Sequence, residues 1–236
     1  MNELLFFVVT FIDLGFVLLA WKLGKEWVYV TIIANIILVS TFAAKLIPIF
    51  GLVTNVCNTF YAAIFIATDI LTEHHGKKVG YRSIWMGFIG LVLFILMGQF
   101  VLRFECVSDS EKVSNAMKIL FSAVPRIAAA SFIAYAIAQS LDVWLFDFLH
   151  KKTGQNHLWF RNNGSTFVSQ LVDSLVFFSL AFVGTVSFGV LMKIIFTGYL
   201  VKLLVAVIDT PFIYLSYRVK GLEVPDIGFL WSKQNV

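Results

Sequence analysis

The sequence predicts an all-α integral membrane protein whose helices cross the bilayer seven times. Of its 236 residues, 59% are hydrophobic and only 14% are charged, whereas soluble domains average about 45–50% and about 25%. A bilayer-spanning helix needs about 20 mainly apolar residues, and seven stretches of the chain offer a run of about this length. None shows the alternating pattern of a membrane β-strand, so a helical bundle is expected rather than a barrel.

The seven stretches follow one another with short connections and leave no room for a soluble domain. They cover residues 4–21, 27–47, 53–72, 83–104, 124–149, 165–188 and 191–217. The first lacks the basic start and the small-residue cleavage site of a signal peptide, so we expect it to be retained as a helix. The polar segment 103–118 is long enough for a short surface helix. We therefore predict one membrane domain over residues 1–236, with an additional N-terminal helix (1–25), a six-helix core (27–217) and a tail (218–236).

The loops predict the orientation of the chain in the cell membrane. With seven spans, Lys and Arg gather on the side that holds the C-terminus, for example at Lys77, Lys78 and Lys151. Cytoplasmic loops carry such an excess, so the N-terminus is expected outside and the C-terminus in the cytoplasm. The same loops explain the net charge of +4, and nothing indicates a surface for nucleic acid.

The third stretch carries Asp69 and ends at Glu73. A spacing of four residues places both carboxylates on one helix face. A charge at bilayer depth costs about 2.5–3.5 kcal/mol even on insertion scales, which favours a functional site. Glu73 lies nearer the cytoplasmic end beside Lys77 and Lys78, where it could instead pair locally and gate release.

The fifth and sixth stretches repeat the pattern Gln-x-x-Asp-x-x-x-Phe. The first copy holds Gln139 and Asp142, the second Gln170 and Asp173, and in each the amide and the carboxylate share a helix face. Such stripes either join helices by hydrogen bonds or line a site. Because a carboxylate in a membrane needs a cation or a solvated cavity, we predict that both Asp residues are a buried functional pair, with a structural ion pair as the alternative.

Four further side chains complete the predicted substrate site. Asn35 lies midway along the second stretch, Tyr135 extends the polar face of the fifth, Arg126 opens the fifth and Lys202 lies within the last. Lys202 or Arg126 is expected to hold one of the two paired Asp residues. The alternative for Arg126 is that its side chain reaches back to the membrane interface.

The absence of several motifs argues against an enzyme. The sequence has no Gly-x-x-x-x-Gly-Lys-Ser/Thr loop, no His-Glu-x-x-His and no Gly-x-Ser-x-Gly. His74 and His75 are adjacent and so point to different helix faces, unlike a zinc pair. We expect no catalytic residues, no metal and no cofactor.

Taken in order, the polar motifs resemble those of the queuosine-precursor transporter family. The motifs are Thr68-Asp69-Ile70-Leu71-Thr72-Glu73 with Gly76, Arg126-Ile127-Ala128 with Ser131, Gln139-x-x-Asp142-Val143 with Phe146, Ser165-Thr166 with Gln170-x-x-Asp173 and Phe177, and Lys202 with Asp209-Thr210-Pro211. The resemblance covers about residues 28–217. The sequence departs from the family in its extra first helix and in His74-His75 before Gly76.

The resemblance implies a six-helix importer of 7-deazaguanine bases, such as 7-cyano- or 7-aminomethyl-7-deazaguanine, which feed tRNA modification. The family is grouped with vitamin uptake transporters, whose substrate-binding subunits have a related design. One alternative is therefore a binding subunit that needs separate ATPase modules, which could dock on the small-residue faces Ala63-x-x-x-Ala67 and Ala130-x-x-x-Ala134-x-x-x-Ala138. Facilitated and proton-coupled import are both open, as is a homodimer.

Overall fold

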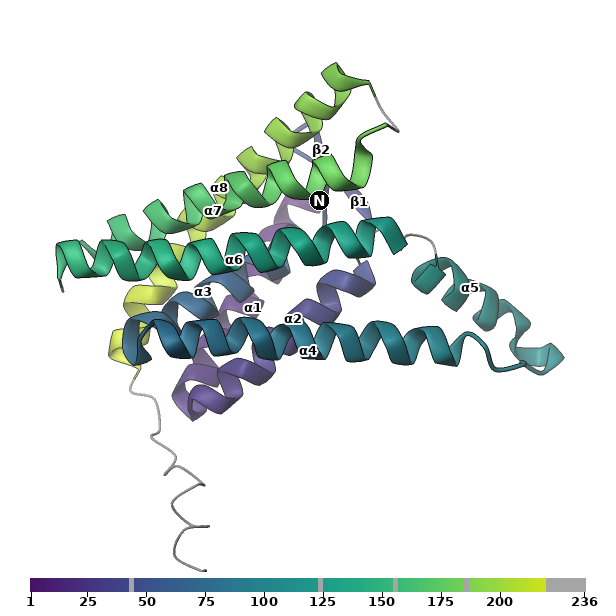
Figure 1. Ribbon diagram of the computed structural model, residues 1–236, viewed down its shortest axis with the longest axis horizontal. Helices are drawn as coiled ribbons and strands as arrows, with labels where there is room; N and C mark the ends of the chain where they lie inside the picture. Colours follow the sequence, from purple (N-terminus) through teal and green to yellow (C-terminus); the bar gives the residue numbers. More distant parts are fainter. Residues whose placement is uncertain (43–44, 123–124, 155–156, 185–186, 220–236) are drawn as a thin grey trace, which may run out of the picture.

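A computed structural model describes residues 1–42, 45–122, 125–154, 157–184 and 187–219, and within these ranges the chain forms seven long helices (Figure 1). A hairpin and two short helical elements connect them. In order, the elements are α1 (Asn2–Leu23), α2 (Lys25–Phe42), β1 (Leu46–Ile49), β2 (Leu52–Asn55), α3 (Asn58–His75), α4 (Lys77–Val101), η1 (Ser108–Ser110), α5 (Glu111–Ser122), α6 (Pro125–Thr153), α7 (Leu158–Phe182) and α8 (Phe188–Arg218).

Six helices of the described chain are long and apolar enough to cross a membrane. They are α1, α2, α4, α6 from Ala129, α7 and α8. The prediction of an all-α membrane protein is confirmed. The third predicted span, however, forms a helix that is not apolar enough by itself to be among these six. Its helix, α3, packs against α1, α2, α4, α6 and α8, and every side chain from Ala62 to Thr72 is buried. Because protein rather than lipid surrounds α3, this helix can carry polar residues.

A short β-hairpin corrects the predicted end of the second stretch and the start of the third. The second was expected to reach residue 47 and the third to begin at 53, but α2 ends at Phe42 and α3 begins at Asn58. Between them β1 pairs antiparallel with β2. The turn is made by Phe50 and Gly51, both with positive φ, 50° and 76°. Residues 46–55 are apolar enough that hydropathy alone extends the neighbouring helical spans into them. Their Pro48 and Gly51 are residue types that favour turns.

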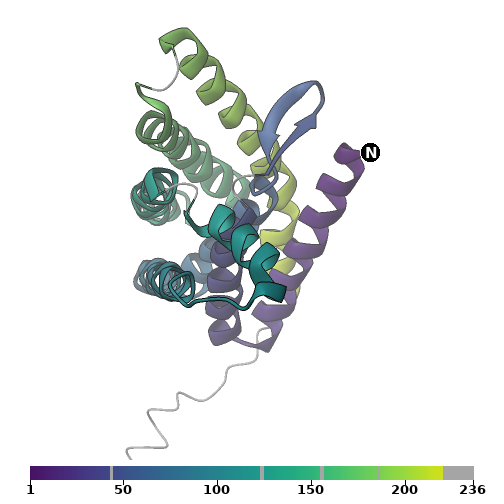
Figure 2. The same ribbon diagram turned by 90° about the vertical axis from the view of Figure 1, so that its right-hand side faces the viewer.

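The hairpin lies beside the N-terminus at one end of the bundle (Figure 2). The Asn2 side-chain amide donates to the Pro48 carbonyl over 3.2 Å, and the Phe50 amide donates to Glu3 over 3.3 Å. The short helix α5 lies at this end too (Figure 1). It begins inside the polar segment 103–118, which was predicted to hold a short surface helix, and it ends four residues after that segment. The C-terminal ends of α1, α3 and α8 lie at the opposite end (Figure 1).

Two glycines let α4 approach its neighbours closely. A Cβ on Gly80 would lie 2.3 Å from the Thr72 hydroxyl of α3, and one on Gly87 would lie 2.4 Å from Ile36 of α2. The alanines of the two predicted docking faces, Ala63, Ala67, Ala130, Ala134 and Ala138, are likewise 0–1% exposed. These small-residue faces pack inside the chain's own bundle, so they are not surfaces for a separate module.

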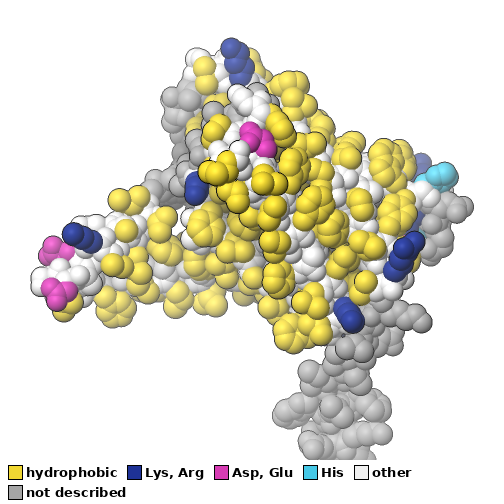
Figure 3. All heavy atoms as spheres, turned by 180° about the vertical axis from the view of Figure 1, so that it is seen from behind, with side chains coloured by type: hydrophobic (Ala, Val, Ile, Leu, Met, Phe, Trp, Pro, Cys, Tyr) yellow, Lys and Arg dark blue, Asp and Glu magenta, His cyan; other side chains and the backbone are white. Residues whose placement is uncertain are grey.

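The outer face of the bundle is apolar over its flank. Side chains such as Trp85, Leu93 and Phe196 are more than half exposed, and in the view from behind, hydrophobic side chains cover the flank while most Lys, Arg, Asp and Glu lie toward the ends (Figure 3). A soluble protein rarely exposes so large a contiguous apolar surface. The distribution fits a helical bundle in lipid.

Candidate functional site

A buried cluster of polar side chains lies among α3, α6, α7 and α8. We call it the central polar cluster. Its members are Asp69 of α3, Gln139 and Asp142 of α6, Gln170 and Asp173 of α7, and Lys202 and Asp209 of α8, and each is at most 8% exposed. Six of these seven residues were predicted as substrate ligands. The fold brings them together because helix spacing places Gln and Asp of each repeated motif on one face, and α6 packs along α7.

Lys202 and Asp173 form a buried ion pair. The Lys202 ammonium donates a hydrogen bond to Oδ2 of Asp173 and lies 5.2 Å from the centre of the Tyr61 ring, a cation–π distance. Of the two cations considered for the paired Asp residues, Lys202 thus binds Asp173. The pair joins α7 to α8, with the Tyr61 ring of α3 packed against it.

Asp142 is held by hydroxyl groups. Ser169 donates a hydrogen bond of 2.8 Å to its Oδ1, and Ser165 and Thr166 lie within hydrogen-bonding reach of the same carboxyl. Asp69 of α3 contacts Asp142, and none of the Lys or Arg side chains that the structure describes forms an ion pair with either carboxyl. Among the described residues, the Asp142 carboxyl is therefore surrounded by hydroxyl groups and a second carboxyl rather than by a cation.

Several buried polar atoms of the cluster have no hydrogen-bond partner among the described residues. Gln139 is 0% exposed, yet neither its amide nitrogen nor its oxygen is bonded. The remaining unbonded oxygens are Oδ1 of Asp69, Oδ2 of Asp142, Oε1 of Gln170, Oδ1 of Asp173 and Oδ1 of Asp209. Buried polar groups nearly always have a hydrogen-bond partner, so these atoms are places where water, an ion or a polar ligand can bind.

A small cavity adjoins the cluster. Gln170, Lys202 and Asp209 line it, with the rings of Tyr61 and Phe65 on the α3 side. Its volume of about 10 Å³ is close to the least that a single water requires and far below the roughly 300 Å³ of small-molecule sites. The wall offers amides, one carboxyl, the Lys202 ammonium and aromatic rings, which suit a flat polar ligand, but a ligand enters only if helices or side chains move.

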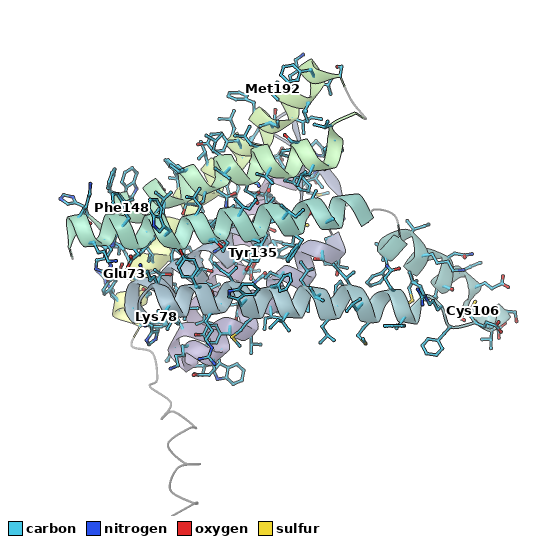
Figure 4. The ribbon with its side chains drawn as sticks, viewed as in Figure 1. Glu73, Lys78, Cys106, Tyr135, Phe148 and Met192 are labelled. Carbon is cyan, nitrogen blue, oxygen red and sulfur yellow. The ribbon has the colours of Figure 1, made fainter. Side chains whose placement is uncertain are left out.

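Glu73 lies apart from this cluster, in a second network nearer the end of the bundle (Figure 4). It accepts hydrogen bonds from Nε of Arg161 at 2.9 Å, from Nη2 of Arg161 and from the Tyr217 hydroxyl, and His150 lies 3.3 Å away. Arg161 also donates to the Gly154 carbonyl. The Glu73 and Arg161 side chains are 1% and 0% exposed. The alternative that Glu73 pairs locally, with Lys77 or Lys78, differs from the structure: Glu73 pairs with Arg161, and Lys77 lies 3.4 Å from Asp147.

Arg161 is the main residue that the sequence failed to indicate. The predicted sixth span began at residue 165 and left Arg161 in a cytoplasmic loop, but α7 begins at Leu158 and buries Arg161, Asn162 and Asn163. These three polar residues interrupt the hydropathy signal. Only their contacts, such as that of the Asn163 amide with the Thr210 hydroxyl at 2.7 Å, show that the helix starts earlier.

The remaining predicted ligands lie at the edge of the cluster or away from it. Tyr135 is buried midway along α6 (Figure 4) and turns its hydroxyl toward Gly87 of α4. Asn35 donates a hydrogen bond to Asp13 of α1 at 3.1 Å and so joins α2 to α1. Arg126 lies in the first turn of α6, but its side chain is outside the described residues.

Comparison with known proteins connects this arrangement to a family. A family model described as "Putative vitamin uptake transporter" matches residues 55–216. "Probable queuosine precursor transporter" of Bacillus subtilis (strain 168) is 34% identical over 204 residues, 86% of this chain and 89% of that protein. The chain belongs to the vitamin uptake transporter family. "Queuosine precursor transporter" of Escherichia coli (strain K12) is 32% identical over 119 residues, 50% of this chain and 51% of that protein. No solved structure matches.

The vitamin uptake transporter match includes the whole central polar cluster. Residues 55–216 run from the end of β2 to the last turns of α8, so α1 and α2 precede the matched region. The resemblance to queuosine-precursor transporters that the motifs indicated is confirmed by the two named relatives. The chain is thus a multi-pass membrane protein of a transporter family, which implies a small-molecule substrate.

Proposed function

We propose that this protein transports a queuosine precursor, a 7-deazaguanine base, across the cell membrane into the cytoplasm. The observation that carries the proposal is the set of unbonded amide and carboxylate atoms buried among α3, α6, α7 and α8. In a membrane bundle, polar residues of this kind are costly and mark substrate pathways. The names of the two relatives supply the class of substrate.

The chemistry of the cluster suits a deazaguanine ring. The ring has a flat apolar face, N–H donors along one edge and a carbonyl acceptor, and proteins read such bases by edge hydrogen bonds and stacking. Asp142 and Asp69 offer acceptors for the N–H edge, Gln139 offers both a donor and an acceptor, and Tyr61 offers a ring. Gln170 lines the neighbouring cavity and offers a further amide.

The buried ion pair of Glu73 and Arg161 indicates which contact opens during transport. The cavity of about 10 Å³ is closed to a base, so binding requires the helices around it to separate, as in alternating access. Glu73 of α3 and Arg161 of α7 tie two of these helices together at the end that the Lys and Arg excess predicts to be cytoplasmic. We assign this network as the contact that must open before the base is released inward.

Uptake measures the proposed function directly. Cells that cannot make queuosine precursors, and that lack ATPase modules of vitamin transporters, are given labelled 7-cyano-7-deazaguanine with either this protein or an empty vector. We expect accumulation of label in tRNA only with the protein. Accumulation equal to the vector control would overturn the proposal, and uptake that returns only when ATPase modules are supplied would make the chain a binding subunit.

A further inference from the structure

Asp69 of α3 and Asp142 of α6 meet inside the bundle, where their carboxyl groups lie within hydrogen-bonding reach of each other. Both residues are buried. In the part of the chain that the structure describes, no Lys or Arg side chain forms an ion pair with either of them. An ionised carboxylate accepts hydrogen bonds but cannot donate one. A hydrogen bond between the two groups therefore requires a proton on one of them.

The surroundings of this carboxyl pair favour one bound proton over none. Two carboxylates that share a site repel each other, so one of them stays protonated. Asp209 of α8 lies close enough to both groups to interact electrostatically and adds a third acid to the site. Other charged side chains described inside the bundle are bonded elsewhere, in the pairs Lys202 with Asp173, Arg161 with Glu73 and Asp13 with Asn35.

Hydroxyl groups determine which of the two acids holds the proton. Ser169 donates a hydrogen bond of 2.8 Å to Asp142, and Ser165 and Thr166 reach the same carboxyl. Donated hydrogen bonds favour the charged form of a carboxyl group. The described hydroxyl groups next to Asp69 on α3 donate to backbone carbonyls instead. The proton therefore lies on Asp69, and Asp142 is the anion.

Buried polar atoms beside the pair leave room in the hydrogen-bonding pattern for a ligand. Gln139 precedes Asp142 by three residues on the same face of α6. It is fully buried, and neither polar atom of its side chain has a partner among the described residues. Oδ1 of Asp69 and Oδ2 of Asp142 likewise lack a described donor. A ligand that reaches Gln139 therefore also meets the carboxyl pair.

We infer that this carboxyl pair is the site of a proton that crosses the membrane together with the base. The inference rests on the proposed function. The N–H edge of the base donates to the Asp142 carboxylate, and protonated Asp69 donates to the neighbouring carbonyl oxygen of the base. A protonated carboxyl group is a donor, whereas an ionised one only accepts. The base therefore binds the protonated pair in preference to the ionised pair.

The same proton determines when α3 and α6 can move apart. With the proton alone, the direct hydrogen bond between Asp69 and Asp142 joins the two helices, which keeps the proton from crossing without the base. A bound base replaces that bond by one bond to each carboxyl group. With neither ligand, the two carboxylates repel each other and the empty protein returns. Only the fully loaded and the empty forms change sides, as coupled alternating access requires.

Glu73 and His150 provide the way out for the proton. Glu73 follows Asp69 by one helical turn, about 6 Å along α3, and lies 3.3 Å from His150, whose side chain is 28% exposed. Chains of Asp, Glu and His carry protons in membrane transporters. When the contact between Glu73 and Arg161 opens, the O–H bond of Asp69 breaks and its proton passes through Glu73 and water to the cytoplasm.

Transport in sealed vesicles tests the coupling. The purified full-length protein is placed in vesicles in sodium-free buffer, with the membrane potential held at zero by potassium and valinomycin. The probe is labelled 7-cyano-7-deazaguanine, whose substituent has no amine to titrate. One proton per base limits accumulation to about tenfold for each pH unit of gradient, acidic outside. We expect accumulation toward this limit with the gradient, none without it, and acidification of the vesicle interior when base is added.

The variant Asp69→Asn separates the proton from the base. The amide still donates to the carbonyl of the base but binds no proton. We expect exchange of labelled for unlabelled base, which needs no return of the empty protein, to continue, and gradient-driven accumulation to disappear. The control Asp147→Asn, which removes a carboxyl group from a partly exposed position on α6, should keep both. A folded Asp69→Asn protein that loses exchange and accumulation together would contradict the inference.

The wild-type protein decides the question even if Asp69→Asn does not fold. Base exchange without gradient-driven accumulation, or accumulation that follows a sodium gradient instead, would overturn the inference and leave the proposed function intact. Absence of base exchange in vesicles would refute the proposed function, and this inference with it.

Discussion

Replacing Glu73 by Gln tests whether the network at the end of α3 holds the helices together. The Gln side chain keeps the shape of Glu73 but cannot neutralise Arg161, which is 0% exposed. Breaking a buried ion pair by removing one partner costs about 3–5 kcal/mol, because an uncompensated charge stays buried. For a chain of this size, 1 kcal/mol shifts the midpoint of thermal unfolding by about 2–4 °C, so we expect Glu73→Gln to lower it by about 6–20 °C.

The assay is thermal unfolding of purified protein in detergent, followed by tryptophan fluorescence. The matched control is Asp147→Asn, whose partners Lys77 and Lys151 are 43% and 64% exposed; exposed pairs contribute about 0–1 kcal/mol. In the double variant Glu73→Gln/Arg161→Met, the buried cation is gone and we expect part of the lost stability to return. A Glu73→Gln midpoint as close to wild type as that of Asp147→Asn would refute the reasoning.

Two further substitutions probe packing and the second buried ion pair. Gly80→Ala places a Cβ 2.3 Å from the Thr72 hydroxyl and should destabilise the protein by about 1–3 kcal/mol. The control Gly189→Ala, whose Cβ would have no atom within 4 Å, should leave the stability unchanged. Equal unfolding midpoints for the two variants would contradict the close approach of α4 to α3. Lys202→Met should reduce the yield of folded protein, measured by size-exclusion chromatography, because it leaves the buried Asp173 carboxylate without its cation. The double variant Lys202→Met/Asp173→Leu should restore the yield. A double variant that folds no better than the single one would contradict the pairing.

Hydropathy predicts most of this fold because lipid imposes a simple rule. A span needs a long apolar run, and six of the seven stretches coincide with helices that meet this rule. The rule fails where protein replaces lipid. α3 is enclosed by five other helices. Its side chains therefore face protein, and its hydropathy does not show whether it crosses the membrane. Hydropathy also missed the hairpin of β1 and β2, because an apolar strand and an apolar helical turn have the same hydropathy.

The sequence predicted most members of the central cluster and part of its pairing, since Lys202 or Arg126 was expected to hold one of the two paired Asp residues. The repeated Gln-x-x-Asp motif fixes which faces of α6 and α7 are polar, and that depends only on helical period. Which cation each acid binds depends on the packing of distant segments. Asp173 and Lys202 are 29 residues apart and Glu73 and Arg161 are 88 apart, and no local pattern in the sequence encodes those contacts.

Equilibrium binding of 7-aminomethyl-7-deazaguanine to wild-type protein, Asp142→Asn and Gln139→Leu tests the central claim most directly. Asp142 and Gln139 are 0% exposed and carry unbonded atoms, so each variant should lose a hydrogen bond to the base. The account predicts a loss of about tenfold or more for Asp142→Asn, from a charge-assisted bond of about 1.5–3 kcal/mol, with a thermal midpoint that shows the variant is folded. If both folded variants bind the base like wild type, the central polar cluster is not the substrate site.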